Sequence, residues 1–222
     1  MKLHNDAKTF KDLVVATSRF TKIAPALIEK DYYVTLVLNE LNKRIDGLLF
    51  KGGTCLAKCY KVINRFSEDI DLTLDNEHFT QSKKREANKV LISLCDCLNL
   101  KIINRDVVDK HSHGSYNCYE IEYPIQYKSD SLKPFLMAEV VFIQKAYPDE
   151  AQMANSYIGE YLLAMDRKDL IKEYELESFA IRTQALQRTL VDKVFAICDY
   201  YLRDEKTRNS RHIYDIYCLL KQ

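Results

Sequence analysis

Two aspartates spaced two residues apart are the part of this sequence that best fits a chemical role. The segment from Ser67 to Leu74 alternates strictly between polar and apolar residues, which is typical of a strand with one polar face. Asp69 and Asp71 share that face, with their Cα atoms expected about 7 Å apart. Carboxylates at this spacing can converge on hard divalent cations, and Mg²⁺ suits them because it also bridges phosphate oxygens. We therefore expect a Mg²⁺ site, with Mn²⁺ as the alternative ion.

A pair of glycines upstream of the aspartates predicts a phosphate-binding turn. Gly52 and Gly53 end the apolar run 48–50, which predicts a short strand. Thr54 is expected to cap a following helix of about three turns. Glycines let the backbone approach a phosphate closely, and the start of a helix offers free N–H groups and the positive end of its dipole to an anion. The segment thus predicts a strand, a glycine turn and a helix that bind a triphosphate.

Glu139 is the candidate for a third carboxylate. It lies in the apolar run 135–144, which predicts a buried strand. Two metal ions about 4 Å apart could activate an attacking hydroxyl and stabilise a pyrophosphate leaving group if a carboxylate from a neighbouring strand joins the aspartates. The alternative interpretation of Glu139 is a charge on an edge strand. A DxD pair or two glycines are weak signals alone, but their joint occurrence favours the catalytic interpretation.

The rest of the chain predicts an α/β region followed by a helical one. Helices are expected at 6–20, 25–43 and 80–98, and further strands at 101–108 and 116–127. After Pro148 the β signals stop, and helical spacing predicts helices at 151–164, 180–203 and 208–220. The predicted fold class is therefore α/β, a mixed sheet with flanking helices and a helical C-terminal region.

Composition restricts the class of protein without defining its partner. The 222 residues are 47% hydrophobic and 29% charged, with five glycines, which is typical of a compact and rather helical protein. A formal charge of +1 gives no bulk argument for a nucleic-acid or membrane partner. No apolar run approaches the roughly 20 residues of a membrane-spanning helix. Seven cysteines without a CxxC pair favour reduced thiols in a cytoplasmic protein.

Two segments resemble the first motif of the AbiEii/AbiGii nucleotidyltransferase toxins, the toxin halves of type IV, abortive-infection-like toxin–antitoxin systems. These segments are Lys51–Lys58 (KGGTCLAK) and Arg65–Leu72 (RFSEDIDL). Further segments that resemble the family in the same order are Glu29–Tyr32, Thr189–Lys193 and Arg211–Tyr217. His212 stands where the family usually has an acid, and Asp192 stands where it more commonly has Glu.

The resemblance implies roles for residues in the second half of the chain. Lys193 and Asp215 are implied to face the two aspartates across a cleft, Lys193 binding the triphosphate and Asp215 orienting or deprotonating the acceptor hydroxyl. The motifs add Arg65, Ser67 and Arg211 as nucleotide-binding residues. From the residues alone, Arg211 and Asp215 fit an ordinary i,i+4 ion pair. Lys193 lies beside an apolar stripe that would let its amine leave the edge of the core and meet a phosphate. That stripe is formed by Leu186, Leu190, Val194 and Ile197.

The expected function combines the residues with the resemblance. Residues 1–147 are expected to form a nucleotidyltransferase catalytic domain, and 148–222 a mostly helical region that completes the active-site cleft. The enzyme would use Mg²⁺ to transfer NMP from an NTP to an acceptor hydroxyl and release pyrophosphate. The resemblance implies an RNA acceptor such as tRNA, a growth-inhibiting toxin, and a separately encoded antitoxin.

Two other functions stay open at this point. One is a small-molecule nucleotidyltransferase of the antibiotic-modifying type, which would need an acidic pocket for a cationic drug. The other is a nucleotide-binding module that keeps the fold but lacks turnover, for which His212 in the last motif is the indication.

Overall fold

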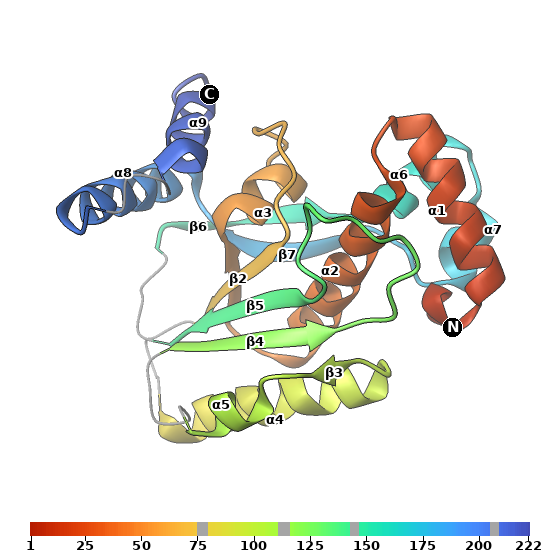
Figure 1. Ribbon diagram of the computed structural model, residues 1–222, viewed down its shortest axis with the longest axis horizontal. Helices are drawn as coiled ribbons and strands as arrows, with labels where there is room; N and C mark the ends of the chain where they lie inside the picture. The colour runs from red at the N-terminus through yellow and green to blue at the C-terminus, as the bar shows by residue number, and fades with distance from the viewer. Residues whose placement is uncertain (75–79, 111–115, 143–146, 205–208) are drawn as a thin grey trace.

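The computed structural model describes residues 1–74, 80–110, 116–142, 147–204 and 209–222. In this part of the chain, helices pack around one seven-stranded mixed sheet with strand order β3-β4-β5-β2-β1-β7-β6 (Figure 1). The strands are β1 (Leu48–Lys51), β2 (Asp69–Leu74), β3 (Lys101–Ile102), β4 (Tyr116–Glu122), β5 (Leu136–Val141), β6 (Asp149–Ala154) and β7 (Phe179–Gln184). The α-helices are α1 (Ala7–Thr21), α2 (Pro25–Arg44), α3 (Gly52–Lys58), α4 (Gln81–Cys97), α5 (Arg105–Lys110), α6 (Tyr157–Ala164), α7 (Lys168–Glu173), α8 (Leu186–Leu202) and α9 (Asn209–Leu219).

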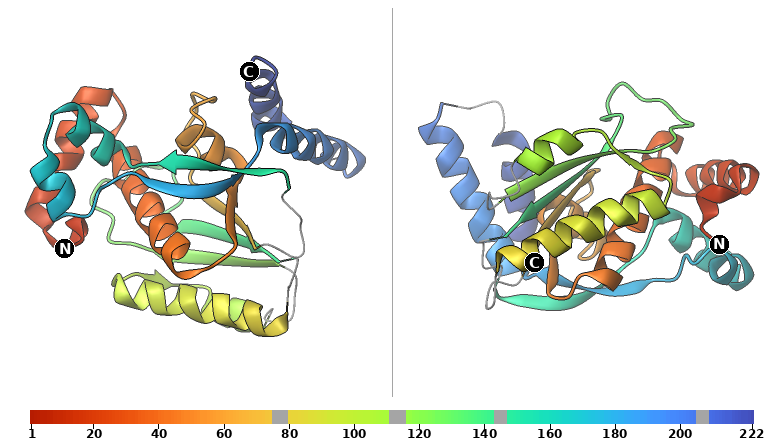
Figure 2. Two further views of the ribbon diagram at one scale, coloured as in Figure 1. Left: turned by 180° about the vertical axis from the view of Figure 1, so that it is seen from behind. Right: turned by 90° about the horizontal axis from the view of Figure 1, so that it is seen from below.

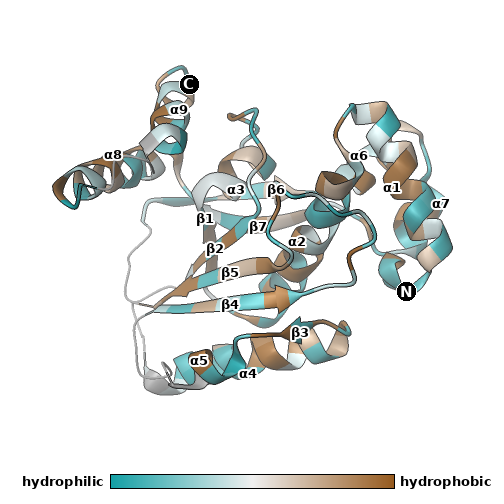
Figure 3. Cartoon of the chain, in the orientation of Figure 1, coloured by the Kyte–Doolittle hydropathy of each residue, from teal (hydrophilic) through white to brown (hydrophobic). Residues whose placement is uncertain are grey.

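The alternation along β2 separates an apolar face of the sheet from a polar one. Leu72 lines an apolar cavity together with Leu41 of α2 and Leu91 of α4, so these two helices cover the apolar face. Because successive side chains of a strand point to opposite faces, Asp69 and Asp71 project from the other side. Hydrophobic residues accordingly run along the central strands β2 and β5 in Figure 3. The alternation predicted from the sequence is confirmed, although β2 begins at Asp69 and not at Ser67.

The expectation that β structure stops after Pro148 is wrong. Residues 149–154 form β6, and 179–184 form β7, which pairs in parallel with β1. The sequence of β6 is Asp-Glu-Ala-Gln-Met-Ala, which contains several good helix formers and no β-branched residue. Its antiparallel pairing with β7 overrides that preference. The sheet therefore extends past the expected boundary at 147/148, and the helices expected at 151–164 and 180–203 begin later, at Tyr157 and Leu186.

Two other predicted strands are shorter than expected. Only 101–102 of the segment 101–108 pair with β4, and α5 begins at Arg105. The side chain of Asn104 explains the change, because it bonds to the backbone of Cys118 at 2.9 Å and of Glu120 at 3.0 Å in place of a further strand residue. The strand expected at 116–127 ends at Glu122. The strand expected at 135–144 is β5, and residues 143 and 144 lie outside the described residues.

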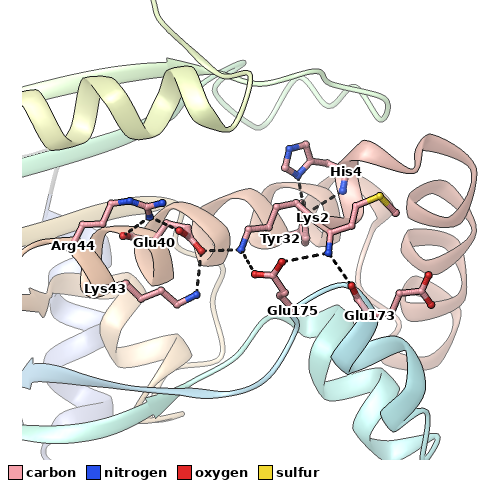
Figure 4. A network of polar contacts seen from close by, with 9 residues as sticks. Lys2, His4, Tyr32, Glu40, Lys43, Arg44, Glu173 and Glu175 are labelled. Atoms are coloured by element: carbon pink, nitrogen blue, oxygen red, sulfur yellow. Dashed lines mark hydrogen bonds and ion pairs between the residues drawn. The ribbon is translucent and has the colours of Figure 1, made fainter.

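The helices at the two ends of the sheet belong to different parts of the chain. Figures 1 and 2 show α1, α6 and α7 together at one end and α8 and α9 at the other. The first group includes the N-terminus, where Lys2 donates to Glu40 of α2 and to Glu175, each at 2.8 Å (Figure 4). Lys2, Lys43 and Arg44 outweigh the effect of burial and hold the pKa of Glu40 down at about 2. This polar network fixes α2 against the chain that follows α7.

Helices α8 and α9 pack on α3 through a small separate apolar cluster. Its buried members are Leu56 of α3, Leu219 of α9, and Ile63 from the segment after α3. Leu186 and Leu190 of α8 are partly buried and pack against these three residues. Val194, expected on the same stripe as these leucines, is instead 45% exposed. The first turns of α8 are therefore the part that fixes its position beside α3. In the described part of the chain, no helix is both long and apolar enough to cross a membrane.

Candidate active site

Glu139, Asp71 and Lys51 form one row across three neighbouring strands. Asp71 on β2 is in register with Glu139 on β5 and with Lys51 on β1. Directly opposed residues of paired strands point to the same face, so two carboxylates and an amine lie side by side. Strand β5 lies between β4 and β2, which makes the edge-strand interpretation of Glu139 wrong.

The carboxylates of this row repel one another in a partly buried setting. Burial, followed by the charge of Glu139, raises the pKa of Asp71 to about 7. Burial, followed by the charge of Asp69, also raises the pKa of Glu139. Asp69 itself is half-buried and lies 3.4 Å from the amine of Lys133. Clustered acids with raised pKa values are typical of functional sites, and a bound cation would relieve their repulsion.

The pKa of Asp71 gives a prediction for the stability of the metal-free protein. The native carboxyl takes up a proton near pH 7 and the unfolded one near pH 4. Between these values the native state binds more protons, so stability falls as the pH rises. We expect a loss of roughly 3–4 kcal/mol across this window. Melting temperatures in EDTA from pH 4 to 8 would measure it, and Asp71→Asn should flatten the curve. An unchanged slope in this variant would contradict the prediction.

The glycine turn lies against the acid Asp71 on one side and against Arg65 and Ser67 on the other. Gly52 has a φ of +78°, and a β-carbon placed on it would lie 1.9 Å from Oδ2 of Asp71. A β-carbon on Gly53 would lie 2.7 Å from Nη2 of Arg65 and 2.9 Å from Oγ of Ser67. Only glycine fits at Gly52, because both the backbone conformation and the space exclude a side chain. The turn therefore lies directly against the predicted nucleotide-binding residues.

Replacing Gly52 with alanine should lower activity about 100-fold or more, because the new methyl group displaces the Asp71 carboxylate. Moving a catalytic group by about 1 Å can reduce the rate about 100-fold. The matched control is Gly47→Ala in the turn before β1, where φ is +73°. That variant carries a similar backbone strain of about 1–2 kcal/mol without touching Asp71. Steady-state kinetics and thermal melting of both variants would test this. Equal losses of activity would show that strain alone matters.

Helix α3 begins earlier than the sequence predicts. It runs from Gly52 to Lys58, with Lys51 as its N-cap residue, so it is shorter than three turns and Thr54 is not the cap. Thr54 is 2% exposed, and within the described residues its Oγ1 has no hydrogen-bond partner. A buried hydroxyl without a partner is costly. Thr54 is thus a free hydrogen-bonding group beside the glycine turn.

Residues from the end of the chain reach this turn through Asp215. Its carboxylate accepts two bonds from Arg65, at 2.8 and 2.7 Å, and one from Lys193 at 2.6 Å. Asp215 is 0% exposed. Burial alone would raise its pKa, but the bonds from Arg65 and Lys193 outweigh burial and lower it. Since a guanidinium atom of Arg65 lies against Gly53, the sequence-predicted Arg65, Lys193 and Asp215 come together at the glycine turn.

Two residues of the last motif take other positions. Arg211 is exposed, and no bond joins it to Asp215 among the contacts of the described residues, so the i,i+4 ion pair is not formed there. The nucleotide-binding role of Arg211 stays a prediction. His212 is partly buried, with its ring 5.6 Å from that of Tyr200. Burial and then the charge of Lys193 lower the pKa of His212. Its surroundings next to the Lys193–Asp215 pair therefore disfavour the charged imidazolium.

Sequence reasoning missed two cationic side chains of the site. Lys51 precedes the glycines directly, and its place in the row beside Asp71 follows from strand pairing alone. Burial lowers the pKa of Lys51, while the charge of Asp71 acts in the opposite direction. Lys133 lies in the segment before β5, and no local pattern connects it with Asp69. The position of Lys51 next to Gly52 was a usable sequence signal for a site residue. The contact between Lys133 and Asp69 could be found only from the folded structure.

The fold and the site together define a class of protein. A mixed sheet with acids on two neighbouring strands, beside a glycine turn that opens a helix, has the arrangement of a nucleotidyltransferase. The family model described as nucleotidyl transferase AbiEii toxin, type IV TA system, matches residues 37–222, and the chain belongs to this family. It is therefore a nucleotidyltransferase enzyme of a toxin family. The similar segment Glu29–Tyr32 lies outside the matched range. No curated protein matches the chain.

Proposed function

We propose that this enzyme transfers NMP from an NTP to a hydroxyl group of RNA, with tRNA as the first candidate, in a Mg²⁺-dependent reaction. The observation that carries the proposal is the partly buried carboxylate of Asp71. It lies against the glycine turn and is paired in register with a second acid, Glu139. Membership of a type IV toxin–antitoxin family supports a nucleotide substrate and an antitoxin partner. In this role the chain acts as a toxin that its antitoxin neutralises.

The donor chemistry of the site fits a hard divalent cation. Asp69, Asp71 and Glu139 supply carboxylate oxygens, and the raised pKa of Asp71 marks negative charge that lacks full compensation. No preformed group of three His, Cys, Asp or Glu ligands is found in the described residues. Mg²⁺ does not need one, because in enzymes it commonly takes one or two carboxylates and completes its shell with water and substrate phosphates. Bound there, the ion would neutralise phosphate charge and favour ionisation of the attacking hydroxyl.

The chain's own residues supply the contacts for a triphosphate. Arg65 and Lys193 are held at the glycine turn by their common partner Asp215. Thr54 offers a hydroxyl that has no partner within the described residues. A carboxylate bound by two cations is a poor proton acceptor, so Asp215 acts here by orienting Arg65 and Lys193. The role as a base for the acceptor hydroxyl, implied by the family resemblance, is not the one that this geometry favours.

The surroundings of the turn favour an anionic acceptor over a cationic drug. A hollow of 290 Å³, open to solvent, adjoins Ser67 and Thr54 and is lined by Lys58 and Lys61. The one acid among its described lining residues is Asp31, which is already paired with Lys58 at 2.5 Å. A cationic antibiotic would find no unpaired carboxylate there, whereas a phosphate backbone would meet the exposed amine of Lys61, which at present pairs with Glu160 at 2.6 Å.

The test is transfer of label from each of four α-³²P NTPs to total RNA with Mg²⁺, beside a panel of aminoglycosides. We expect label on RNA that disappears in EDTA and in the Asp69→Ala/Asp71→Ala variant. Asp199→Ala, which removes a half-exposed surface acid of α8, is the matched control and should label RNA normally. Label on an aminoglycoside alone would replace the proposed acceptor. NTP binding without transfer to any acceptor would indicate a binding module.

A further inference from the structure

Lys30 of α2 is a completely buried lysine with two partners at the edge of the site. Its side chain is 0% exposed and forms an ion pair with Glu68. Its Nζ also donates to the backbone oxygen of Lys133 at 2.6 Å. Burial lowers the pKa of Lys30, and the bond to Glu68 counters this effect. One amine thus joins two segments that lie far apart in the sequence.

Both partners of Lys30 lie shortly before the strands that carry the acids. Glu68 is the residue before Asp69, the first residue of β2. Lys133 lies three residues before β5, which begins at Leu136, and its own amine reaches back to Asp69 at 3.4 Å. Strands β2 and β5 pair in parallel, so their starting ends lie side by side. Lys30 therefore connects the N-terminal ends of β2 and β5, the two strands that carry the acids.

The residues next to Lys30 on α2, Glu29 and Asp31, form hydrogen bonds to other segments of the chain. Glu29 accepts the backbone N–H groups of Gln126 and Tyr127, each at 2.9 Å. Asp31 accepts from Lys58 at the end of α3 at 2.5 Å and from the N–H of Tyr157 at 2.8 Å. All three charges are buried. A buried ion pair adds little net stability compared with an apolar replacement, so stability alone does not account for such a run of charges.

We propose that Lys30 is a positioning residue that holds the starts of β2 and β5 together, so that Asp69 and Asp71 of β2 and Glu139 of β5 stay close enough to contribute to the proposed divalent-cation site. The inference deepens the proposed function and rests on its metal site. Among the described contacts, Lys30 forms no hydrogen bond or ion pair with the three carboxylates. Its charge acts on Asp69 over a longer distance, and its direct contacts are with Glu68 and the backbone of residue 133. Loss of such supporting contacts typically lowers metal affinity or activity about 10- to 100-fold.

The test separates positioning from stability with two variants and one control. Lys30→Met leaves the partly buried Glu68 without its partner and should lower the melting temperature. Lys30→Met/Glu68→Gln removes both charges and should recover stability, but it still lacks the bond to residue 133. Lys84→Met removes an equally buried lysine on α4, whose amine lies 4.9 Å from the ring centre of Phe142. Each protein is measured for Mn²⁺ affinity by electron paramagnetic resonance without NTP, and for kcat and KM with NTP.

The expected result is a 10- to 100-fold loss of Mn²⁺ affinity and of kcat in both Lys30 variants, with a change in the KM for NTP below about threefold. Lys84→Met should keep wild-type Mn²⁺ affinity and kcat. The proposal is overturned if the double variant, at wild-type melting temperature, binds Mn²⁺ and turns over normally while Asp71→Asn does not. If Asp71→Asn also binds Mn²⁺ normally, the metal site itself is wrongly assigned and the proposed function fails with it.

Discussion

Asp71→Asn should lower kcat about 10³-fold or more without weakening the fold. Asparagine has nearly the same shape, so the contact with the glycine turn at Gly52 is kept. What disappears is the negative charge, on which the proposed metal site depends. A 10³-fold loss corresponds to about 4 kcal/mol of transition-state stabilisation. Because the acid is partly desolvated and is repelled by Glu139, removing its charge should stabilise the metal-free protein at neutral pH and not unfold it.

The measurement is single-turnover transfer of labelled NMP, with thermal melting in EDTA and in Mg²⁺ beside it. Wild-type protein should gain stability when Mg²⁺ is added, since a ligand that binds only the native state stabilises it, and Asp71→Asn should gain much less. Asp199→Asn on the surface of α8 is the control and should behave as wild type. A variant that keeps even a tenth of the wild-type rate would remove Asp71 from the catalytic residues.

The part of the site that lies close together in the sequence could be predicted because its patterns are local. The glycines follow a short apolar run, and Asp69 and Asp71 fall on one face of an alternating segment. Pairing β1 with β2 then brings Lys51 next to Asp71. The third acid was also predictable, because Glu139 interrupts an apolar run and an acid in a buried strand has to have a compensating partner.

The contacts between distant segments could not be predicted from such patterns. Lys30 lies in a helix whose apolar spacing is clear, and nothing around it indicates that its amine reaches residues 68 and 133. The two strands after Pro148 were missed for a related reason. Strand β6 has helix-forming residues and is held in the sheet by its partner β7, so its structure is decided by tertiary pairing and not by its own sequence.

The family motifs identified Lys193 and Asp215, but the structure changes what they are expected to do. An acid that holds two cations and is completely buried is suited to orienting them. Arg65 comes from the segment between α3 and β2, and Lys193 from α8, so Asp215 of α9 joins three separate segments at one point. The helical pair α8–α9 thus brings both Lys193 and Asp215 to the glycine turn.

Asp215→Asn should therefore reduce activity about 10²- to 10³-fold and destabilise the protein. The neutral amide of asparagine cannot form charged hydrogen bonds with both Arg65 and Lys193. Breaking a buried ion pair by removing one partner costs about 3–5 kcal/mol. A loss of positioning predicts a higher KM for NTP together with a lower kcat, because Arg65 and Lys193 are no longer held at the turn. The exposed residue Arg211 on the same helix provides the control, and Arg211→Ala should be near wild type in melting temperature.

The pH profile distinguishes this role from general-base catalysis. If Asp215 accepts the proton of the acceptor hydroxyl, the acidic limb of kcat/KM should disappear in Asp215→Asn. If it only orients Arg65 and Lys193, the profile should keep its shape at a lower level, because the groups that titrate during the reaction are still present. The lowered pKa of Asp215 favours the second outcome, since a carboxylate stabilised in its charged form by Arg65 and Lys193 has little tendency to take up a proton.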